Sequence, residues 1–297
     1  MHYDGPTFRP PYEADSILLQ VTKGCSHNAC RFCVMYKGQA FGLSPLDEVE
    51  ADVIEASQVQ TWATRVFLEN GDAFCLPADR LLKIADMVHE HLPNVDVITG
   101  YARIQNVATK TDEELAALAA ADYDQINIGV ESGLDQVLDW MNKGYSVDQA
   151  REQLLRLRKA GIRFSLNIIN AAAGPDLMAR SAAANAVLCN QVQPYLIFVS
   201  PLHVDPGSAI EWEVASGRFV ECDLGSYIDE EIAFLEALEL EDCVFYGMHV
   251  SNPVPCSGWL PRDKERLLEQ LHAGKARFTE EQLRSHPAKG AEGRLRL

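Results

Sequence analysis

The chain has 297 residues, of which 47% are hydrophobic, and a formal net charge of −17 at pH 7. This length and composition can build one large hydrophobic core, with or without a small appendage. Because a field of this sign repels phosphate backbones, nucleic acid is disfavoured as a general partner.

The opening sequence and the apolar runs bear on the compartment. MHYDGPTFRPPYEAD is polar and proline-rich and lacks the apolar region of a secretory leader. No uninterrupted apolar run reaches membrane-spanning length. One cluster of thiols in an otherwise cysteine-sparse chain is typical of the reducing cytoplasm. We therefore expect a cytoplasmic protein with no membrane partner, in an anaerobic or oxygen-protected setting if these thiols hold a low-potential cluster.

Residues 1–15 are predicted to form an extended arm, because Pro6, Pro10 and Pro11 remove backbone donors. Short apolar runs then alternate with amphipathic stretches. The predicted strands are Ile17–Val21, Arg65–Leu68, Val95–Thr99, Gln125–Val130, Ile162–Ile169 and Tyr195–Ser200.

Helix starts between these strands are marked by capping residues. Ser44 is the expected N-cap of the first helix, with Pro45 at its first position. The second helix is expected at Pro77–His89 and a later one at Asp176–Gln191. Two capping boxes are predicted, Thr111 with Glu114 and Ser146 with Gln149, and the helix after the second box is expected to end at Gly161.

Six strand–helix units in succession predict a parallel sheet with helices outside it. There are too few units for a closed eightfold barrel. In such folds ligands bind at the carboxyl ends of the strands, so the polar residues after each strand are the informative ones.

The stretch VTKGCSHNACRFCVMY, which follows the first strand, carries Cys25, Cys30 and Cys33. Three thiolates this close together indicate a soft metal or an iron–sulfur cluster. Together with His27 they could also form a Cys3His zinc site, although no second pair of closely spaced ligands follows. The other cysteines are dispersed and are expected to be small buried residues rather than ligands of a second cluster: Cys75, Cys189, Cys222, Cys243 and Cys256.

This loop resembles the cluster loop of the radical SAM superfamily, in which three cysteines hold three irons of a [4Fe–4S] cluster and S-adenosylmethionine (SAM) chelates the fourth. The usual spacing there is Cys-x3-Cys-x2-Cys, and this chain has one extra residue in the first gap. The later phrase LDQVLDWMNKGYS resembles the Elp3-like and coproporphyrinogen-oxidase-like branch.

The resemblance covers roughly residues 16–210 and implies an α/β fold, an open (β/α)6 partial TIM barrel, with a [4Fe–4S] cluster and SAM as cofactors. Residues 1–15 would then be an N-terminal arm. Residues 211–297, in which we expect an acidic helix at Asp229–Leu240 and helices near Pro261 and Thr279, would form a helical and strand extension that closes the barrel.

The resemblance also implies cofactor contacts for residues that follow the strands. Asn70, Gly71 and Asp72 partly match a Gly-Gly-Glu motif that binds the methionine amino group; a plain turn is the alternative. Arg103 could bind a carboxylate bidentately or form a surface ion pair.

Further along, Glu131 and Ser132 in GVESG match residues that meet the SAM ribose. Asn167 would meet the adenosyl group or be a satisfied interior residue. Leu202 and Val204 match an adenine-facing segment, and Phe32 would supply an apolar wall for the adenine; these three are the expected base-binding residues.

The segment CVFYGMHVSNPVPCSGWLP resembles one in small uncharacterised proteins of this superfamily. His249 and Asn252 are therefore expected to face the substrate or to hold the extension, and Tyr246 to act as a hydrogen relay. A structural turn with a buried histidine, and a core position for Tyr246, are the alternatives.

The function that this resemblance implies is reductive cleavage of SAM to a 5′-deoxyadenosyl radical. The radical would abstract hydrogen from a small or medium-sized metabolite in an oxidation, cleavage, decarboxylation or rearrangement, with an electron donor such as flavodoxin or ferredoxin as partner. A porphyrin- or tRNA-directed radical SAM reaction is one alternative. A non-catalytic iron–sulfur or zinc protein is another.

Overall fold

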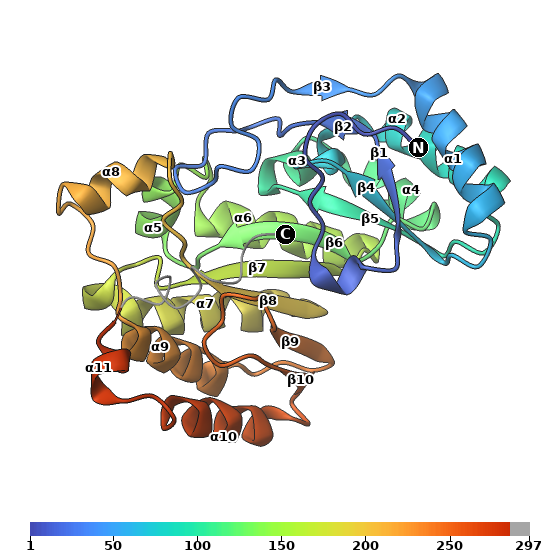
Figure 1. Cartoon of the computed structure of the whole chain (residues 1–297). Coiled ribbons are helices and arrows are strands. Elements are labelled where there is room, and N and C mark those ends of the chain that lie inside the picture. The colour runs from blue at the N-terminus through green and yellow to red at the C-terminus, as the bar shows by residue number, and fades with distance from the viewer. Residues whose placement is uncertain (286–297) are drawn as a thin grey trace. The chain divides into compact units, whose positions relative to one another are not determined.

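The computed structural model of the chain, shown in Figure 1, describes residues 1–285. Its residues cluster into two compact units. The first comprises Met1–Asn28, Met35–Gly129 and Glu152–Ser165, and the second comprises Ala29–Val34, Val130–Arg151 and the chain from Leu166 onward. The predicted division at residues 15 and 210 remains a prediction, and residues 286–297 of the predicted extension lie outside the described part.

Parallel strands form the centre of the first unit. Their order is β1 (Ile17–Gln20), β4 (Arg65–Glu69), β5 (Val97–Ala102) and β6 (Ile126–Glu131). Ile17 pairs with Val66, and Arg65 pairs with Val97. A short antiparallel pair, β2 (Thr22–Lys23) with β3 (Gly42–Leu43), brackets the cysteine loop. The strand β5 starts and ends later than the predicted Val95–Thr99, because it runs from Val97 to Ala102.

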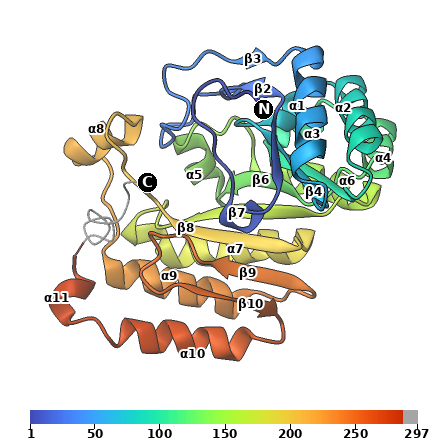
Figure 2. The same ribbon diagram turned by 45° about the vertical axis from the view of Figure 1, so that its right-hand side comes forward.

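Helices cover these strands, and α2 packs against both α1 and α4, as Figure 2 shows. Their apolar faces are buried, for example Val49 and Val53 of α1 and Leu81 and Ile84 of α2. The elements are α1 (Leu46–Val59), the short turn η2 (Ala73–Cys75), α2 (Ala78–His91), α3 (Ile104–Ala108) and α4 (Asp112–Ala120).

The predicted N-cap of α1 is wrong. Pro45 occupies the N-cap position, and no side chain caps the helix. Ser44 instead belongs to the preceding segment, since its N–H donates to the carbonyl of Val21 at 3.1 Å and its own carbonyl accepts from Arg80. Both predicted capping boxes are confirmed by reciprocal hydrogen bonds.

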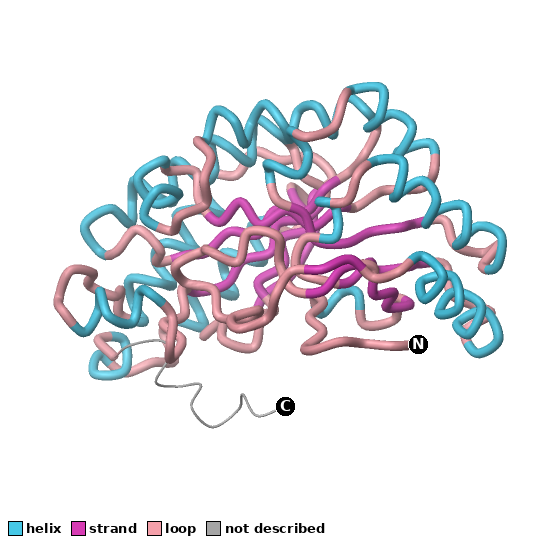
Figure 3. The backbone as a smooth tube through the Cα atoms, turned by 90° about the horizontal axis from the view of Figure 1, so that it is seen from above, coloured by secondary structure: helices cyan, strands magenta, loops and turns pink. Residues whose placement is uncertain are grey.

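The second unit continues the alternation with β7 (Phe164–Asn170), β8 (Leu196–Pro201), β9 (Cys243–Gly247) and β10 (Cys256–Leu260), in that order. The strand β9 is parallel to β8, and β10 is antiparallel to β9. Figure 3 shows the strands in magenta and the helices in cyan. The helices are α5 (Asp135–Trp140), α6 (Val147–Ala160), α7 (Met178–Val192), α8 (Ala209–Ala215), α9 (Leu224–Ala237), α10 (Lys264–Lys275) and α11 (Glu280–Leu283).

The predicted acidic helix begins earlier than expected. It starts at Leu224 and not at Asp229, because Asp223 caps it by accepting the N–H of Ser226 at 2.7 Å. The extension thus contains strands as well as helices, as predicted, and β9 adds a further parallel strand next to β8.

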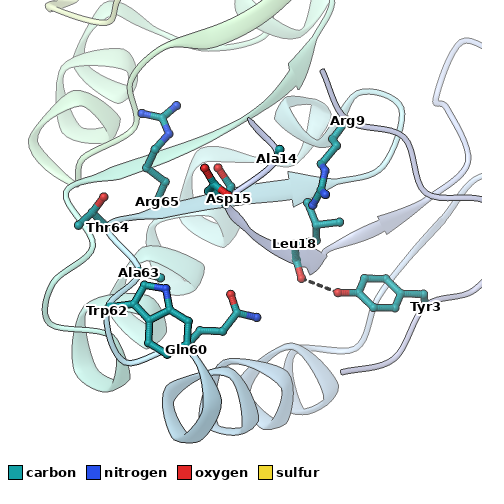
Figure 4. A pocket seen from close by; sticks show the side chains of 11 residues that line it. Tyr3, Arg9, Ala14, Asp15, Leu18, Gln60, Trp62, Ala63, Thr64 and Arg65 are labelled. Atoms are coloured by element: carbon teal, nitrogen blue, oxygen red, sulfur yellow. Dashed lines mark hydrogen bonds between the residues drawn. The ribbon is translucent and has the colours of Figure 1, made fainter. Parts of the chain in front are cut away.

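The N-terminal arm is tied to the strands of the first unit by side-chain hydrogen bonds. Tyr3 donates to the carbonyl of Leu18 at 2.9 Å, and Tyr12 donates to Asn127 at 2.5 Å. A pocket of about 710 Å³ lies between the arm and the segment before β4. Figure 4 shows it with Trp62 at one side, and it contains none of the predicted site residues. Among residues 1–285, no helix combines the length and the apolar character needed to cross a bilayer.

Candidate functional site

The first part of the cysteine loop is held within the first unit. Cys25 is half-buried and follows Gly24, whose φ of +65° makes the turn after β2. The next residue, Ser26, donates its N–H to Asp72 at 2.8 Å and its hydroxyl to the same carboxylate. Asn28 has a φ of +42° and donates its amide to the carbonyl of Tyr36 at 2.9 Å. The turn that presents Cys25 is therefore fixed by Asp72 from outside the loop and by Asn28 from within it.

The second part of the loop is held within the second unit. The N–H of Cys33 donates to the carbonyl of Cys30 at 3.3 Å, which closes a turn between the two cysteines. Asn142 donates its amide to the carbonyl of Ala29 at 2.8 Å. The N–H of Arg31 donates to the carbonyl of Met141 at 3.0 Å. The MNKG stretch, singled out in the sequence, thus holds the backbone that carries Cys30 and Cys33.

The eight thiols differ in their surroundings. Cys25, Cys30 and Cys33 are half-exposed. Of the five cysteines predicted to be buried, Cys75 is also half-exposed, and four are buried: Cys189, Cys222, Cys243 and Cys256. Burial raises the pKa of the last three of these to about 12, which disfavours the ligating thiolate. Only the loop cysteines therefore combine exposure with the spacing of a cluster-binding set, and their donor chemistry fits iron. Among residues 1–285, the structure gathers no three His, Cys, Asp or Glu side chains into a metal-binding group.

The turn after β4 places Asn70, Gly71 and Asp72 directly against the first part of the loop. A Cβ on Gly71 would lie 2.7 Å from the Cβ of Cys25. Asn70 is buried, and its side-chain oxygen accepts from Tyr36 at 3.2 Å while its Nδ2 has no partner. An unpaired buried amide donor and a close backbone approach suit a turn that meets a polar ligand.

The GVESG motif is built around a buried ion pair. Lys143 contacts Glu131 at 3.0 Å, and both side chains are less than 8% exposed. Burial alone would lower the pKa of Lys143, but Glu131, followed by Tyr145 and Cys30, raises it, so the ammonium stays charged. One oxygen of Glu131, Oε2, is buried without a hydrogen-bond partner. Ser132 accepts the N–H of Leu134 at 3.2 Å, which makes it a turn residue.

The motif's second glycine allows a helix to approach closely. A Cβ on Gly133 would lie 2.4 Å from the carbonyl oxygen of Ala184 on α7. The N–H of Gly133 donates to Asn185 at 2.6 Å. The end of β6 is therefore fixed by α7 as well as by the ion pair.

The three expected base-binding residues come together. Phe32, Leu202 and Val204 all belong to one apolar cluster in the second unit, which also contains Met141 and Ile169. Leu202 is anchored there by its N–H, which donates to the carbonyl of Asn170 at 2.9 Å. Lys143 lies 5.9 Å from the centre of the Phe32 ring, so the apolar cluster borders the buried ion pair.

Two other expected contacts are less distinctive. Asn167 is half-buried in β7. Arg103 is half-buried and is the N-cap residue of α3, where its N–H donates to Asn106 at 2.7 Å. The cofactor roles of both residues stay predictions.

The expected substrate residues separate into two groups. Tyr246 stacks on Phe198 with ring centres 5.7 Å apart, and His249 contacts the same ring edge-on. Burial, and then the neighbouring His203, lower the pKa of His249, which favours the neutral imidazole. These rings form an aromatic cluster in which Phe198 of β8 is buried, whereas Tyr246 of β9 and His249, which follows β9, are half-buried.

Asn252, in contrast, is buried with its side chain fully engaged. Its Nδ2 donates to the carbonyls of Val199 and Gly247 at 3.1 and 2.8 Å, and its Oδ1 accepts from Tyr227 at 3.2 Å. This geometry favours the second of the two predicted roles, that of holding the extension.

Three ionisable residues beside the predicted site residues were given no role from the sequence: Lys143 pairs with Glu131, Glu69 directly precedes Asn70, and the N–H of Cys75 donates to the carbonyl of Asp72. Lys143 lies in the phrase LDQVLDWMNKGYS, where it is the single cation. Glu69 ends β4, is fully buried, and has a pKa that burial raises to about 7. Cys75 lies in η2, and burial, with Asp72 next, raises its pKa to about 12. Nothing in the local sequence distinguished the last two.

Comparisons with known proteins give a family and a fold. A sequence model described as the radical SAM superfamily matches residues 19–173. A curated relative, tRNA-2-methylthio-N6-dimethylallyladenosine synthase of Pseudoalteromonas atlantica, is 25% identical over 167 residues, which are 53% of this chain and 34% of that protein. The chain thus spans about a third of the length of that relative.

Solved structures agree on the architecture. Methylornithine synthase superposes with a TM-score of 0.57 at 13% identity, over 86% of this chain and 68% of that one. Elp3 of Methanocaldococcus infernus superposes with a TM-score of 0.56 at 13% identity, over 91% of this chain and 64% of that one. Coproporphyrinogen III oxidase of Escherichia coli superposes with a TM-score of 0.56 at 15% identity, over 74% of this chain and 52% of that one. At these identities the likeness shows the fold alone, and it confirms the predicted α/β partial-barrel type; closure by residues 211–297 remains a prediction.

Proposed function

Because this chain belongs to the radical SAM superfamily, whose members are enzymes that use a [4Fe–4S] cluster and SAM, we propose that it cleaves SAM reductively and acts on a small or medium-sized metabolite. The observation that carries this proposal is the set of three half-exposed cysteines, the only ones with cluster spacing, on a loop held by side chains from elsewhere in the chain.

The roles of the chain's residues follow from their surroundings. When bound, the cluster supplies an electron and SAM a carbon radical that removes hydrogen from a substrate. Cys25, Cys30 and Cys33 would hold three irons. The backbone carbonyls of the Asn70–Gly71 turn would accept hydrogen bonds from the methionine amino group.

Two further regions would bind the rest of the nucleotide. Glu131, with its unpaired buried oxygen, would accept the ribose hydroxyls, and the adjacent Lys143 would offer a cation to the carboxylate of SAM. The apolar cluster around Phe32, Leu202 and Val204 would cover the adenine and exclude water from the reacting atoms.

The substrate class is proposed from charge. A net charge of −17 disfavours a polynucleotide, so a small metabolite is favoured over RNA. A tRNA-directed reaction is the second candidate, because the curated relative, by its name, modifies a tRNA adenosine. We further propose a cytoplasmic location and a small electron-transfer protein, such as flavodoxin or ferredoxin, as the reductant.

The test is anaerobic reconstitution with iron and sulfide, reduction with dithionite, and addition of SAM. The proposal expects about four irons per chain and release of 5′-deoxyadenosine and methionine. Protein that binds zinc alone, or that binds the cluster and leaves SAM intact, would contradict it. Transfer of deuterium from labelled deoxyadenosine to a metabolite pool, or to tRNA, would then decide between the two substrates.

The aromatic cluster gives a prediction about coupling. Replacing His249 with Ala should remove product formation while SAM cleavage continues uncoupled, because the histidine packs against Phe198 and His203, neither of which is a proposed cofactor residue. The ratio of deoxyadenosine to product measures this. His272→Ala on the exposed face of α10 is the control and should keep the wild-type ratio. An unchanged ratio in His249→Ala would mean that this residue stabilises the turn after β9 and has no part in coupling.

A further inference from the structure

We propose that Asp72 is a positioning residue for the cysteine loop, and that its carboxylate holds Ser26 and so fixes the turn that carries Cys25. The inference deepens the proposed function and rests on it only where the cluster is concerned. It differs from the expectation, drawn from the Gly-Gly-Glu resemblance, that Asp72 contacts the methionine amino group.

The contacts of Asp72 carry the proposal. Its Oδ1 accepts the N–H of Ser26 at 2.8 Å, and its Oδ2 accepts the hydroxyl of the same residue. Asn106 adds its amide to Oδ2 at 3.4 Å. Asp72 is fully buried, so these three donors are what balances its charge in the described structure. Hydrogen bonds to an ionised carboxylate are about twice as strong as neutral ones.

The carboxylate is itself held rigidly. The carbonyl of Asp72 accepts the N–H of Cys75 at 2.8 Å, which closes the turn η2. The side chain of Asn106, which donates to Asp72, is itself held because its Oδ1 accepts the N–H of Arg103 at 2.7 Å. Asp72 is therefore a fixed point to which the more exposed Ser26 is attached.

The loop has a specific need for such a point. Its first gap is one residue longer than the usual spacing, and a longer flexible loop loses more entropy when its ends are fixed. Ser26 is the first residue of that gap, and the chain turns again at Asn28, which has a φ of +42°. Fixing Ser26 confines the longer gap before the chain reaches Cys30.

The consequence concerns the cofactor contact. Three donors from Ser26 and Asn106 already occupy most of the acceptor positions of the Asp72 carboxylate, so we expect the backbone carbonyls of Asn70 and Gly71 to accept from the methionine amino group. Loss of Asp72 should then disturb the cluster before SAM is added.

Two measurements on the full chain test this, with Ser26→Ala, Asp72→Ala and the double variant. The first is hydrogen–deuterium exchange of the metal-free protein. In Asp72→Ala the segment 24–28 should exchange about tenfold faster, since the N–H of Ser26 loses a charged acceptor. If Asp72→Ala and the wild type exchange at the same rate in this segment, Asp72 does not hold Ser26 and the proposal is wrong. This measurement needs no cluster. It therefore tests whether Asp72 holds Ser26 even if the wild type takes up no iron and the proposed function fails.

The second measurement is the rate at which the reconstituted protein loses iron to a chelator without SAM. Both single variants should lose iron faster, Asp72→Ala by about tenfold, and the double variant should equal Asp72→Ala, because the two side chains act through one interaction. Exposed Asp86→Ala on α2 is the control and should match wild type. If both single variants lose iron at the wild-type rate and Asp72→Ala weakens only SAM binding, Asp72 contacts the cofactor and does not position the loop. If Asp72→Ala fails to fold, Ser26→Ala and Asp72→Asn carry the same comparison.

Discussion

Cys30→Ala should abolish iron retention and deoxyadenosine formation together. A [4Fe–4S] cluster with an open iron needs all three loop thiolates, and the turn from Cys30 to Cys33 places two of them in one short segment. Removing Cys30 leaves one ligand in that turn and one at Cys25. Iron and sulfide per chain after anaerobic reconstitution, and deoxyadenosine after reduction, measure the two losses.

The matched control is Cys189→Ala on α7. Cys189 is fully buried, and its thiol is held neutral because burial raises its pKa well above the ordinary value. This variant should keep the wild-type iron content and lose about 1 kcal/mol of stability through the small cavity. Wild-type iron in Cys30→Ala, or an equal loss in both variants, would mean that the loop does not hold the cluster.

The fold could be predicted from the sequence because its signals are local. Apolar runs and capping boxes depend on residues three or four positions apart, and both capping boxes are confirmed. The errors lie at helix starts. Ser44 does not cap α1 and belongs to the preceding segment, where its N–H is bonded to the carbonyl of Val21, more than twenty positions back. The acidic helix starts at Leu224, because Asp223 caps it by accepting the N–H of Ser226.

The site was predicted in part, for the same reason. The cysteine spacing and the GVESG phrase are contiguous, and the structure brings Phe32, Leu202 and Val204 into one cluster as the resemblance implied. What no local pattern contains is the partner of a polar side chain. Asp72 is 46 positions from Ser26, and Glu131 is joined to Lys143 across a whole helix. Burial of Glu69 likewise depends on the N-terminal arm, whose Phe8 N–H faces it at 3.4 Å.

Gly71→Ala tests whether the turn after β4 and the cysteine loop act as one unit, and it does so with a single added carbon. That carbon would lie 2.7 Å from the Cβ of Cys25, 2.8 Å from Cε2 of Tyr36 and 3.0 Å from the carbonyl oxygen of Gly24. The Cβ of Cys25 and the carbonyl oxygen of Gly24 both belong to the tight turn after β2, so the cysteine loop itself must move to make room. Such overpacking costs about 1–3 kcal/mol of folding stability.

The expected result is a folded protein with a displaced Cys25, weaker iron retention, and SAM cleavage reduced by about a hundredfold, the effect that a misplacement of about 1 Å at a reacting centre can have. Gly42→Ala in β3 is the matched control, because a Cβ there meets nothing within 4 Å and the residue belongs to the strand that closes the same loop. Iron content, thermal unfolding and deoxyadenosine formation should therefore be near wild type in Gly42→Ala. Equal behaviour of the two variants would show that the close contact between Gly71 and Cys25 does not constrain the loop, and the assignment of this turn to the cofactor site would lose its structural basis.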